Sequence, residues 1–459
     1  MIPSHIIHRQ SIRTHVVGNA LQATEVQQQI ADLLQSHHYF TALDKVLTEF
    51  SGVGAWLEVD RVDVNLGTFS IGNFEKAFIE KIQTALREKL LDVIPDAILA
   101  GKTVQKTNED LDFEALLYFL ENGVLPFYAL SGGIKKGQSQ QGFEKWVDSI
   151  VTNLSDTQLS FLVLLLQKSA VARQRVFYAF SEKTVFLILK KINPSTPLSI
   201  LTLKKVKSIF LKSETARQDS VFAFLIFKIE EKVLLEALEV LMVKIVRLNV
   251  SKTEQESAIL NFINNQTPPD ANNVIKEKAV EKQVEKVSSD TVFIQNAGIV
   301  LLHPFMSSCF ETCNWLKDGY FKNERTQYKA LLMLHFLAIG KAQATEFDLF
   351  LPKILCGIPE NTPIPQGKEG LTKKEKAEGE ALLQAAIAHW QVLKNTSPDG
   401  LREGFLQRDG KLERNAFGGW TLTVEQKAQD ILLSQLPYGW GVSMVKFDWM
   451  KEVLEVNWA

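Results

Sequence analysis

Hydrophobic positions in the first 95 residues follow two different periods. Ile and Val residues between positions 5 and 17 are separated by polar residues, which predicts a strand. Apolar residues then recur every three or four positions from 21 to 50 and again from 74 to 91, which predicts helices. Between them, residues 57–66 alternate in hydrophobicity with one slip at Asp60-Arg61 that would suit a β-bulge. This order predicts a small N-terminal α/β unit over residues 1–95.

Residues 96–265 have the spacing of helices almost throughout. The predicted helices cover residues 111–120, 143–154, 160–167, 172–192, 203–211 and 221–246. Pro194 and Pro197 interrupt the pattern, because proline lacks a backbone donor and clashes with the preceding turn. The apolar faces are broad, which favours helices that pack against one another. The sequence therefore predicts an all-α middle of packed helices.

Residues 266–290 have the composition of a linker. Prolines open the segment, and alternating Lys and Glu residues follow with isolated valines and no aromatic residue. Low hydrophobicity with balanced charge is typical of a flexible or transiently helical connector.

Residues 291–459 are expected to form a C-terminal, mainly helical domain with a few strands. Thr372 and Glu375 have the spacing of a capping box in front of a helix at 373–394. Ser397-Pro398 is a typical helix start, and residues 420–424 alternate as a strand does. The whole chain is predicted to be α+β and mostly α-helical.

Composition excludes several classes of protein. The 459 residues are 46% hydrophobic and 23% charged with a net charge of −2, so a global basic surface for nucleic acid is absent. Three cysteines cannot form a disulfide framework, which favours a reducing compartment. The N-terminus lacks the pattern of a secretory signal, and no apolar run approaches the ~18 residues of a membrane span. We expect a cytoplasmic protein with no membrane span.

The segment from Gly132 to Ser139 is the best candidate for enzymatic chemistry. It matches the phosphate-loop pattern except that Gln138 stands where a lysine should reach the phosphates. Pro126 makes the preceding segment a poor central strand. The favoured interpretation is a loop between helices, and a nucleotide-binding enzyme is the unlikely alternative.

The candidates for metal binding are Cys309 and Cys313, which lie four residues apart, with His303 and Cys356 as further candidates. Zinc sites usually have two closely spaced pairs, and a free cysteine is commonly a small buried residue. No nucleophile and base share a recognisable motif. We therefore predict no catalytic residues, no cofactor, no metal and no enzymatic activity.

Residues 170–212 carry a local excess of positive charge. This stretch contains nine Lys and Arg residues, Arg173 and Arg175 among them, and one acidic residue, Glu182, so its net charge is +8. Such a run could face an acidic partner or nucleic acid, but it is more often the solvated side of amphipathic helices. Aromatic residues for base stacking are lacking, so no nucleic acid partner is predicted.

Several segments together resemble the tape measure proteins of extracellular contractile injection systems, which are phage-tail-like particles. In the C-terminal domain the resembling segments are NAGIVLLHPF (296–305), KILCGIP (353–359), HW (389–390), LKNTS (393–397), GLR (400–402), FLQR (405–408), LPYGW (436–440) and WM (449–450). Earlier in the chain they are HII (5–7), DRVDVNLG (60–67) and YFLENGVLP (118–126). Residues 140–290 carry little of the resemblance.

The resemblance implies a non-enzymatic assembly protein whose length sets where polymerisation of the inner tube stops. It implies as partners the inner tube protein, spike or baseplate components and a tube-terminating cap protein, and it leaves self-association in the tube lumen open. Assembly in the cytoplasm and retention inside the particle would follow. All 459 residues as one helix would span roughly 690 Å, and residues 96–290 roughly 290 Å. A soluble adaptor or chaperone for the baseplate or tube of the same particle is the alternative.

Large amphipathic side chains in the C-terminal domain are the candidates for partner contact. They are Trp390, Arg402, Arg408, Trp440 and Trp449. The alternative for Trp390 is a place in the core, and the two arginines could instead pair with Asp399 and Asp409 nearby.

Overall fold

The computed structural model divides the chain into two compact units, Met1–Glu114 and Ala115–Ala459, and each is described by itself. The structure describes residues 5–204 and 291–458. Within these ranges it leaves out positions 6, 8–9, 11, 18–19, 51–55, 58–61, 70–73, 100–104, 127, 130–139, 195–199, 201–202, 366–369 and 416–417.

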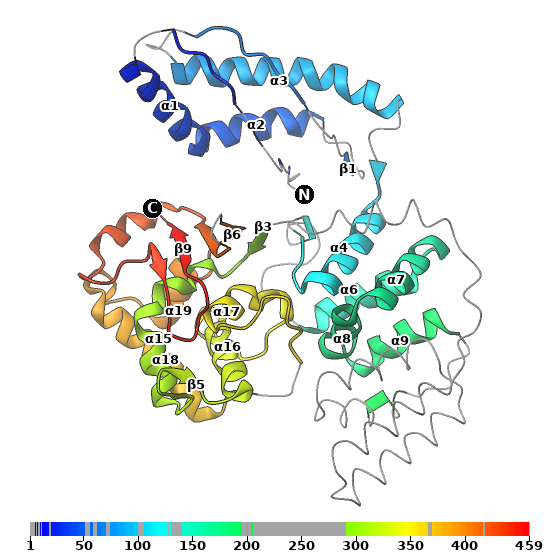
Figure 1. The fold of residues 1–459 in the computed structure, drawn as a ribbon, viewed down its shortest axis with the longest axis vertical. Helices are drawn as coiled ribbons and strands as arrows, with labels where there is room; N and C mark the ends of the chain where they lie inside the picture. Colours follow the sequence, from blue (N-terminus) through cyan, green and yellow to red (C-terminus); the bar gives the residue numbers. More distant parts are fainter. Residues whose placement is uncertain are drawn as a thin grey trace, which may run out of the picture. The chain divides into compact units, whose positions relative to one another are not determined.

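The first unit is built around three helices. They are α1 (Ala20–Gln35), α2 (His37–Glu49) and α3 (Phe74–Leu99), and the short strands β1 (Trp56–Leu57) and β2 (Gln105–Lys106) pair antiparallel. Leu33, Tyr39, Leu43, Phe78 and Ile82 form the core between the helices. In Figure 1, α2 lies alongside α3, and α1 packs against α2.

Three sequence predictions in the first unit are wrong. The described residues of 5–17 form no strand, and among the described residues of 57–66 (57 and 62–66) only Leu57 lies in one. Ile12, Val64 and Leu66 pack against the helical core, so the alternation marks one apolar side of an irregular segment. The helix predicted over 21–50 breaks at Ser36, whose hydroxyl accepts a hydrogen bond from the Tyr39 N–H at 3.2 Å and begins α2.

The second unit begins with a helical segment, residues 115–192. It holds the end of α4 (Asn108–Asn122), then α6 (Gln140–Thr152), α7 (Asp156–Lys168), α8 (Ala170–Ala179) and α9 (Glu182–Ile192). The helix predicted over 172–192 is divided at Ser181, whose backbone N–H donates to Glu144 at 3.1 Å. The helices predicted beyond Lys204 and the linker at 266–290 lie outside the described residues.

The C-terminal part of the second unit, residues 291–458, contains a five-stranded mixed sheet. Its order is β3-β6-β7-β9-β8, with β3 (Thr291–Ile294), β6 (Gly410–Arg414), β7 (Trp420–Val424), β9 (Leu454–Asn457) and β8 (Met444–Val445). Only the β7–β9 pair among these is parallel. A separate hairpin joins β4 (Leu316–Lys317) to β5 (Tyr320–Phe321).

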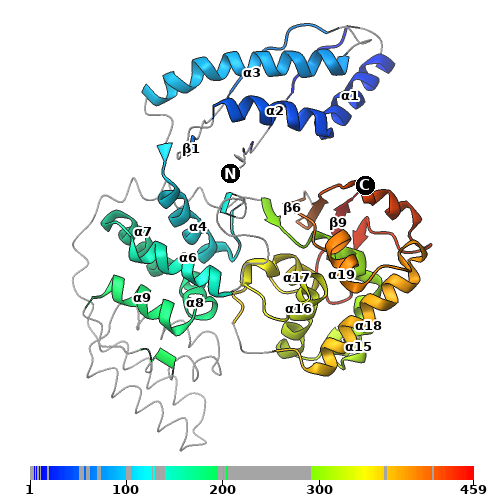
Figure 2. The same ribbon diagram turned by 180° about the vertical axis from the view of Figure 1, so that it is seen from behind.

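Helices surround this sheet and supply most of the C-terminal part (Figures 1 and 2). They are η3 (Ala297–Leu302), α15 (His303–Thr312), α16 (Glu324–Ile339), η4 (Glu346–Leu349), α17 (Phe350–Leu355), α18 (Lys373–His389), η5 (Gln391–Leu393), α19 (Pro398–Leu401), η6 (Arg402–Leu406) and η7 (Ala428–Gln435). One core of buried apolar side chains is continuous through the sheet and these helices.

Local predictions in the C-terminal part are confirmed. The Thr372–Glu375 capping box starts α18, the Ser397 hydroxyl caps α19, and residues 420–424 form β7. Helix α18 ends at His389 and not at residue 394, because Trp390 leaves the helical conformation and its side chain enters the core. The fold class, α+β and mostly α-helical, is confirmed as well.

Candidate functional site

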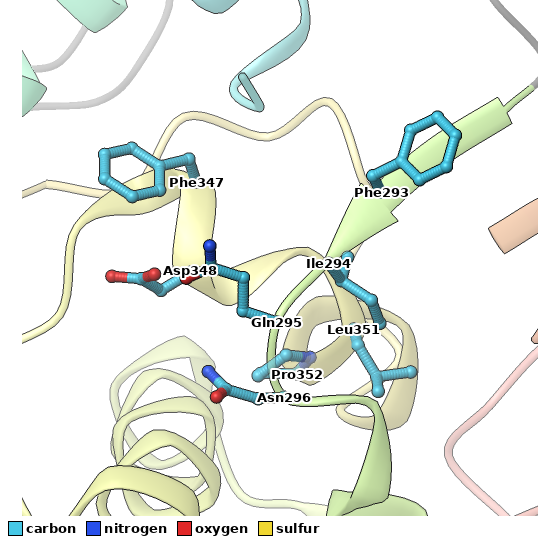
Figure 3. Close-up of a pocket in the computed structure, with 8 residues that line it drawn as sticks. All are labelled: Phe293, Ile294, Gln295, Asn296, Phe347, Asp348, Leu351 and Pro352. Carbon is cyan, nitrogen blue, oxygen red and sulfur yellow. The ribbon is translucent and has the colours of Figure 1, made fainter. Parts of the chain in front are cut away.

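A small pocket lies between the end of β3 and the η4–α17 segment of the C-terminal part (Figure 3). Its lining residues are Phe293, Ile294, Gln295, Asn296, Phe347, Asp348, Leu351 and Pro352. The enclosed space holds about one water molecule. This pocket is far too small for a nucleotide, and the phosphate-loop-like residues 132–139 lie outside the described residues.

The cysteine candidates do not gather into a metal site. Within the described residues, no three His, Cys, Asp or Glu side chains are placed to hold a metal ion. Cys309 and Cys356 are buried and Cys313 is half-buried. Burial raises the pKa of the Cys356 thiol, which therefore stays protonated at neutral pH.

The most unusual chemical arrangement is a cluster of three charged side chains buried inside the second unit. Arg175 lies in α8, Glu346 in η4 and Lys353 in α17, and their side chains are 0%, 0% and 1% exposed. The Arg175 Nε donates to Glu346 Oε1 at 3.1 Å, and the Lys353 Nζ donates to the same oxygen at 2.9 Å. We call these three residues the buried ion cluster.

Backbone oxygens complete the hydrogen bonding of the two cations. Arg175 donates to the carbonyls of Leu120 and Glu121 at the end of α4, and to the backbone and side-chain oxygens of Asn361, both at 2.8 Å. Lys353 donates to the Glu360 carbonyl at 3.1 Å. Unpaired carbonyls at a helix C-terminus favour a cation, so the Arg175 guanidinium also caps α4.

The carboxylate is less completely paired than the cations. Glu346 Oε2 is buried without a hydrogen-bond partner within the described part of the chain. The cluster therefore sets two cations against one carboxylate, with one oxygen unsatisfied. A buried ionic cluster is weak evidence for stability, because each charge loses its hydration on burial.

Gly123 permits the close packing around this cluster. Its φ of +74° ends α4 in the left-handed conformation, and its N–H donates to the Phe119 carbonyl at 2.7 Å. A Cβ at this position would lie 2.5 Å from Glu346 Oε1 and 2.9 Å from Arg175 Nη2. Glycine is therefore required here by both the backbone and the space.

The cluster joins segments that the sequence marked for other reasons. YFLENGVLP contains Gly123, and KILCGIP contains Lys353, so two of the resembling segments meet at one site. Arg175 was grouped with solvated basic side chains, and its complete burial corrects that interpretation. Glu346 was not singled out by the sequence. For Arg175, the one signal available in the sequence was its position next to the apolar residues Val176 and Phe177.

The titration of Lys353 should appear in the pH dependence of stability. Burial lowers the pKa of the Lys353 ammonium below its usual 10.5, although Glu346 opposes this shift. Folded chains then bind fewer protons than unfolded chains above the lowered pKa, so this group adds to the free energy of unfolding as pH rises toward 10.5. We expect this rise to vanish in Lys353→Met, measured by urea unfolding from pH 7 to 10. Parallel stability curves for the two proteins would contradict it.

Trp390 and Trp440 lie together in the core of the C-terminal part. They are 1% and 5% exposed, with ring centroids 6.2 Å apart. Trp390 makes an edge contact with Phe405 at 4.9 Å, and the Trp440 Nε1 donates to the Leu301 carbonyl at 2.7 Å. Both side chains have packing roles within this chain, and their contact with a partner stays a prediction.

Arg402 and Arg408 are also buried, and each has a carboxylate partner. Arg402 pairs with Asp399 at 2.8 Å, which is one of the two alternatives that the sequence left open, and also with Glu380, and it donates to the Leu337 carbonyl at 3.1 Å. Arg408 forms a two-pronged pair with Asp430. Both arginines therefore link segments of this chain, while their roles toward partners are untested predictions.

Trp449 is half-buried, and it is the most accessible of the five candidates for partner contact. Its ring stacks on Phe447 with centroids 4.7 Å apart, and its Nε1 donates to the Leu355 carbonyl at 2.9 Å. Gly357 lets this segment approach, because a Cβ there would lie 2.4 Å from the Trp449 carbonyl oxygen. Trp449 thus holds the segment before β9 against the end of α17.

None of the described helices is by itself long and apolar enough to cross a bilayer, and α6 and α7 reach that length and composition only as a pair bent by 119°. Neither the curated proteins nor the solved structures include a match to this chain.

In the described residues, buried charged and aromatic side chains link segments that are far apart in sequence. These contacts hold the fold together, which is a structural role. The family model described as contractile injection system tape measure protein matches residues 4–458. The chain belongs to this family, whose members are structural proteins. The match spans nearly the whole chain, including the region at 140–290 where the sequence showed little resemblance.

Proposed function

We propose that this protein acts as the length-determining component of a contractile injection particle. The observation that carries the proposal is the family match over residues 4–458. The two folded units provide a structured body near each end of the chain, which suits a molecule held at both ends of a growing tube. The expected partners are the inner tube protein, the spike or baseplate and a tube-terminating cap.

Assembly in the cytoplasm and retention inside the finished particle belong to the same proposal. A protein that sets tube length must be present while the tube grows, and it is then enclosed by the tube. Mass spectrometry of purified particles should detect the chain at a few copies. Its absence from intact particles would favour the adaptor function instead.

A soluble assembly adaptor is the second candidate, and the packing of the helical segment favours it. Helices α6 to α9 are short, each begins directly after a serine in the sequence, and they pack against one another as a folded body. A body of this kind spans much less distance than the same residues in one helix. If these helices stay packed inside the particle, the segment contributes little to a ruler.

Tube length should change in proportion to residues added or removed between positions 205 and 290. These residues lie in the sequence between the two described parts of the second unit, so changes there alter no described residue. A helical ruler predicts about 1.5 Å of tube per residue, so 28 residues correspond to roughly 42 Å. Electron microscopy of purified particles measures this change.

The matched control inserts the same number of residues at the Asp318-Gly319 turn between β4 and β5. This exposed hairpin turn lies inside the C-terminal part, so lengthening it should not change the tube. Tubes of constant length after changes in both places, with the chain retained in the particle, would reject the ruler and leave an assembly role.

A further inference from the structure

We propose that the buried ion cluster is an opening point, at which the helical segment and the C-terminal part separate as two intact folded bodies. The inference rests on the proposed function in one respect: the opening would let a compact chain become extended during tube assembly. The proposal itself concerns the contacts between residues 115–192 and residues 291–458 of the second unit.

Each body has a core of its own. Buried side chains of α6 to α9, among them Val147, Leu162, Val176 and Leu189, lie in the helical segment. The continuous core of the C-terminal part includes from the helical segment the buried Val124, with Tyr118 packed against it. Separation would therefore leave most buried apolar surface of both bodies in place.

A charged cluster and an aromatic contact also join the two bodies. Arg175 reaches across to Glu346 and Asn361. Phe347, beside Glu346, contacts Phe143 at 5.0 Å and Phe119 at 6.4 Å between ring centroids. Phe347 is only partly buried. These contacts add to the apolar contact of Val124 and Tyr118 with the C-terminal core.

Opening would return the charges to water. In the closed form two cations share one carboxylate, and Glu346 Oε2 has no hydrogen-bond partner within the described residues. The Lys353–Glu346 pair stays within the C-terminal part, and hydration of Arg175 and Glu346 in the open form offsets the loss of the attraction between them, because burial of ions carries a large desolvation penalty. A cluster of this type therefore holds the two bodies in register and still allows them to part.

The two bodies are far apart along the sequence. The 86 residues from 205 to 290 join the two bodies, and a chain of that length can reach up to roughly 280 Å. Arg175 and Glu346, which meet in the closed form, are 171 residues apart in sequence.

Distance measurements on the full chain test the opening. Spin labels would be placed at Lys183→Cys, whose side chain is 79% exposed, and at the fully exposed Tyr438→Cys, with Cys313→Ser in every variant. Glu346→Gln removes the one carboxylate that both buried cations contact directly, so it should increase the population at long distances at least tenfold. Circular dichroism should show unchanged helix content.

Two further variants make the result decisive. Phe347→Ala removes the aromatic contact without leaving an unpaired charge, and it should also increase the long-distance population. Asp430→Asn makes the same chemical change in the Arg408 pair inside the C-terminal part, and it should leave the distances as they are. Unchanged distances in Glu346→Gln, or long distances that appear only together with loss of helix content, would overturn the proposal. Tube length is not part of this readout, so failure of the ruler would be seen separately.

Discussion

Gly298→Ala is expected to unfold the C-terminal part of the second unit. Gly298 lies in η3 and is completely buried. A Cβ at this position would lie 1.7 Å from the Phe405 carbonyl oxygen, 2.8 Å from its carbon and 2.9 Å from the Leu406 Cα. All three are backbone atoms of η6, so no rotation of a side chain relieves the clash. The expected loss is about 4 kcal/mol or more, beyond the range of ordinary overpacking.

Gly404→Ala is the matched control for this substitution. Gly404 lies in η6 itself, and no atom lies within 4 Å of the position that its Cβ would take. Alanine there should change stability by no more than about 1 kcal/mol, since it also restricts the unfolded chain. Thermal and urea unfolding of the full chain measure both variants. Equal midpoints for Gly298→Ala and Gly404→Ala would contradict the packing of η3 on η6.

Features that depend on neighbouring residues could be predicted from the sequence. The Thr372 capping box, the Ser397 cap and the end of α9 before Pro194 each follow from groups a few residues apart. The strand at 420–424 was recognisable for the same reason, because its alternation reports a sheet with one buried face.

Features that depend on distant residues could not be predicted in this way. The alternation at Val64 and Leu66 also suits a strand, and only the helices packed beside these residues show that no strand forms. Arg175 and Glu346 are 171 positions apart, and no local pattern connects them. Arg175 was assigned to a solvated face because a charged residue is usually exposed.

The candidates for partner contact illustrate the same limit of local reasoning. Large amphipathic residues such as Trp390 and Arg408 are favoured both at interfaces and in cores. The sequence alone does not separate the two environments, and the structure places both side chains almost wholly inside the chain. The resembling segments nevertheless pointed to real junctions, since Gly123, Gly298, Lys353 and Gly357 each lie where two segments meet.

Asp430→Ala should destabilise the C-terminal part by about 3–5 kcal/mol, the usual effect of leaving a buried charge without its partner. Arg408 is 0% exposed and Asp430 is 6% exposed. The Asp430 carboxylate accepts from the Arg408 guanidinium and, at 3.1 Å, from the Trp458 Nε1. Removal of this carboxylate leaves both the buried Arg408 guanidinium and the Trp458 N–H without their acceptor. Urea unfolding followed by tryptophan fluorescence measures the loss.

The double substitution Arg408→Met/Asp430→Leu separates charge pairing from the other contacts of Arg408. Apolar residues of similar size avoid the desolvation penalty, so the double variant should be more stable than Asp430→Ala alone. Recovery should be incomplete, because Arg408 also donates to the carbonyls of Gly404 at 2.9 Å and Glu425 at 3.1 Å. A double variant as unstable as the single one would mean that these carbonyl contacts, and not the ion pair, hold η6, η7 and the end of the chain together.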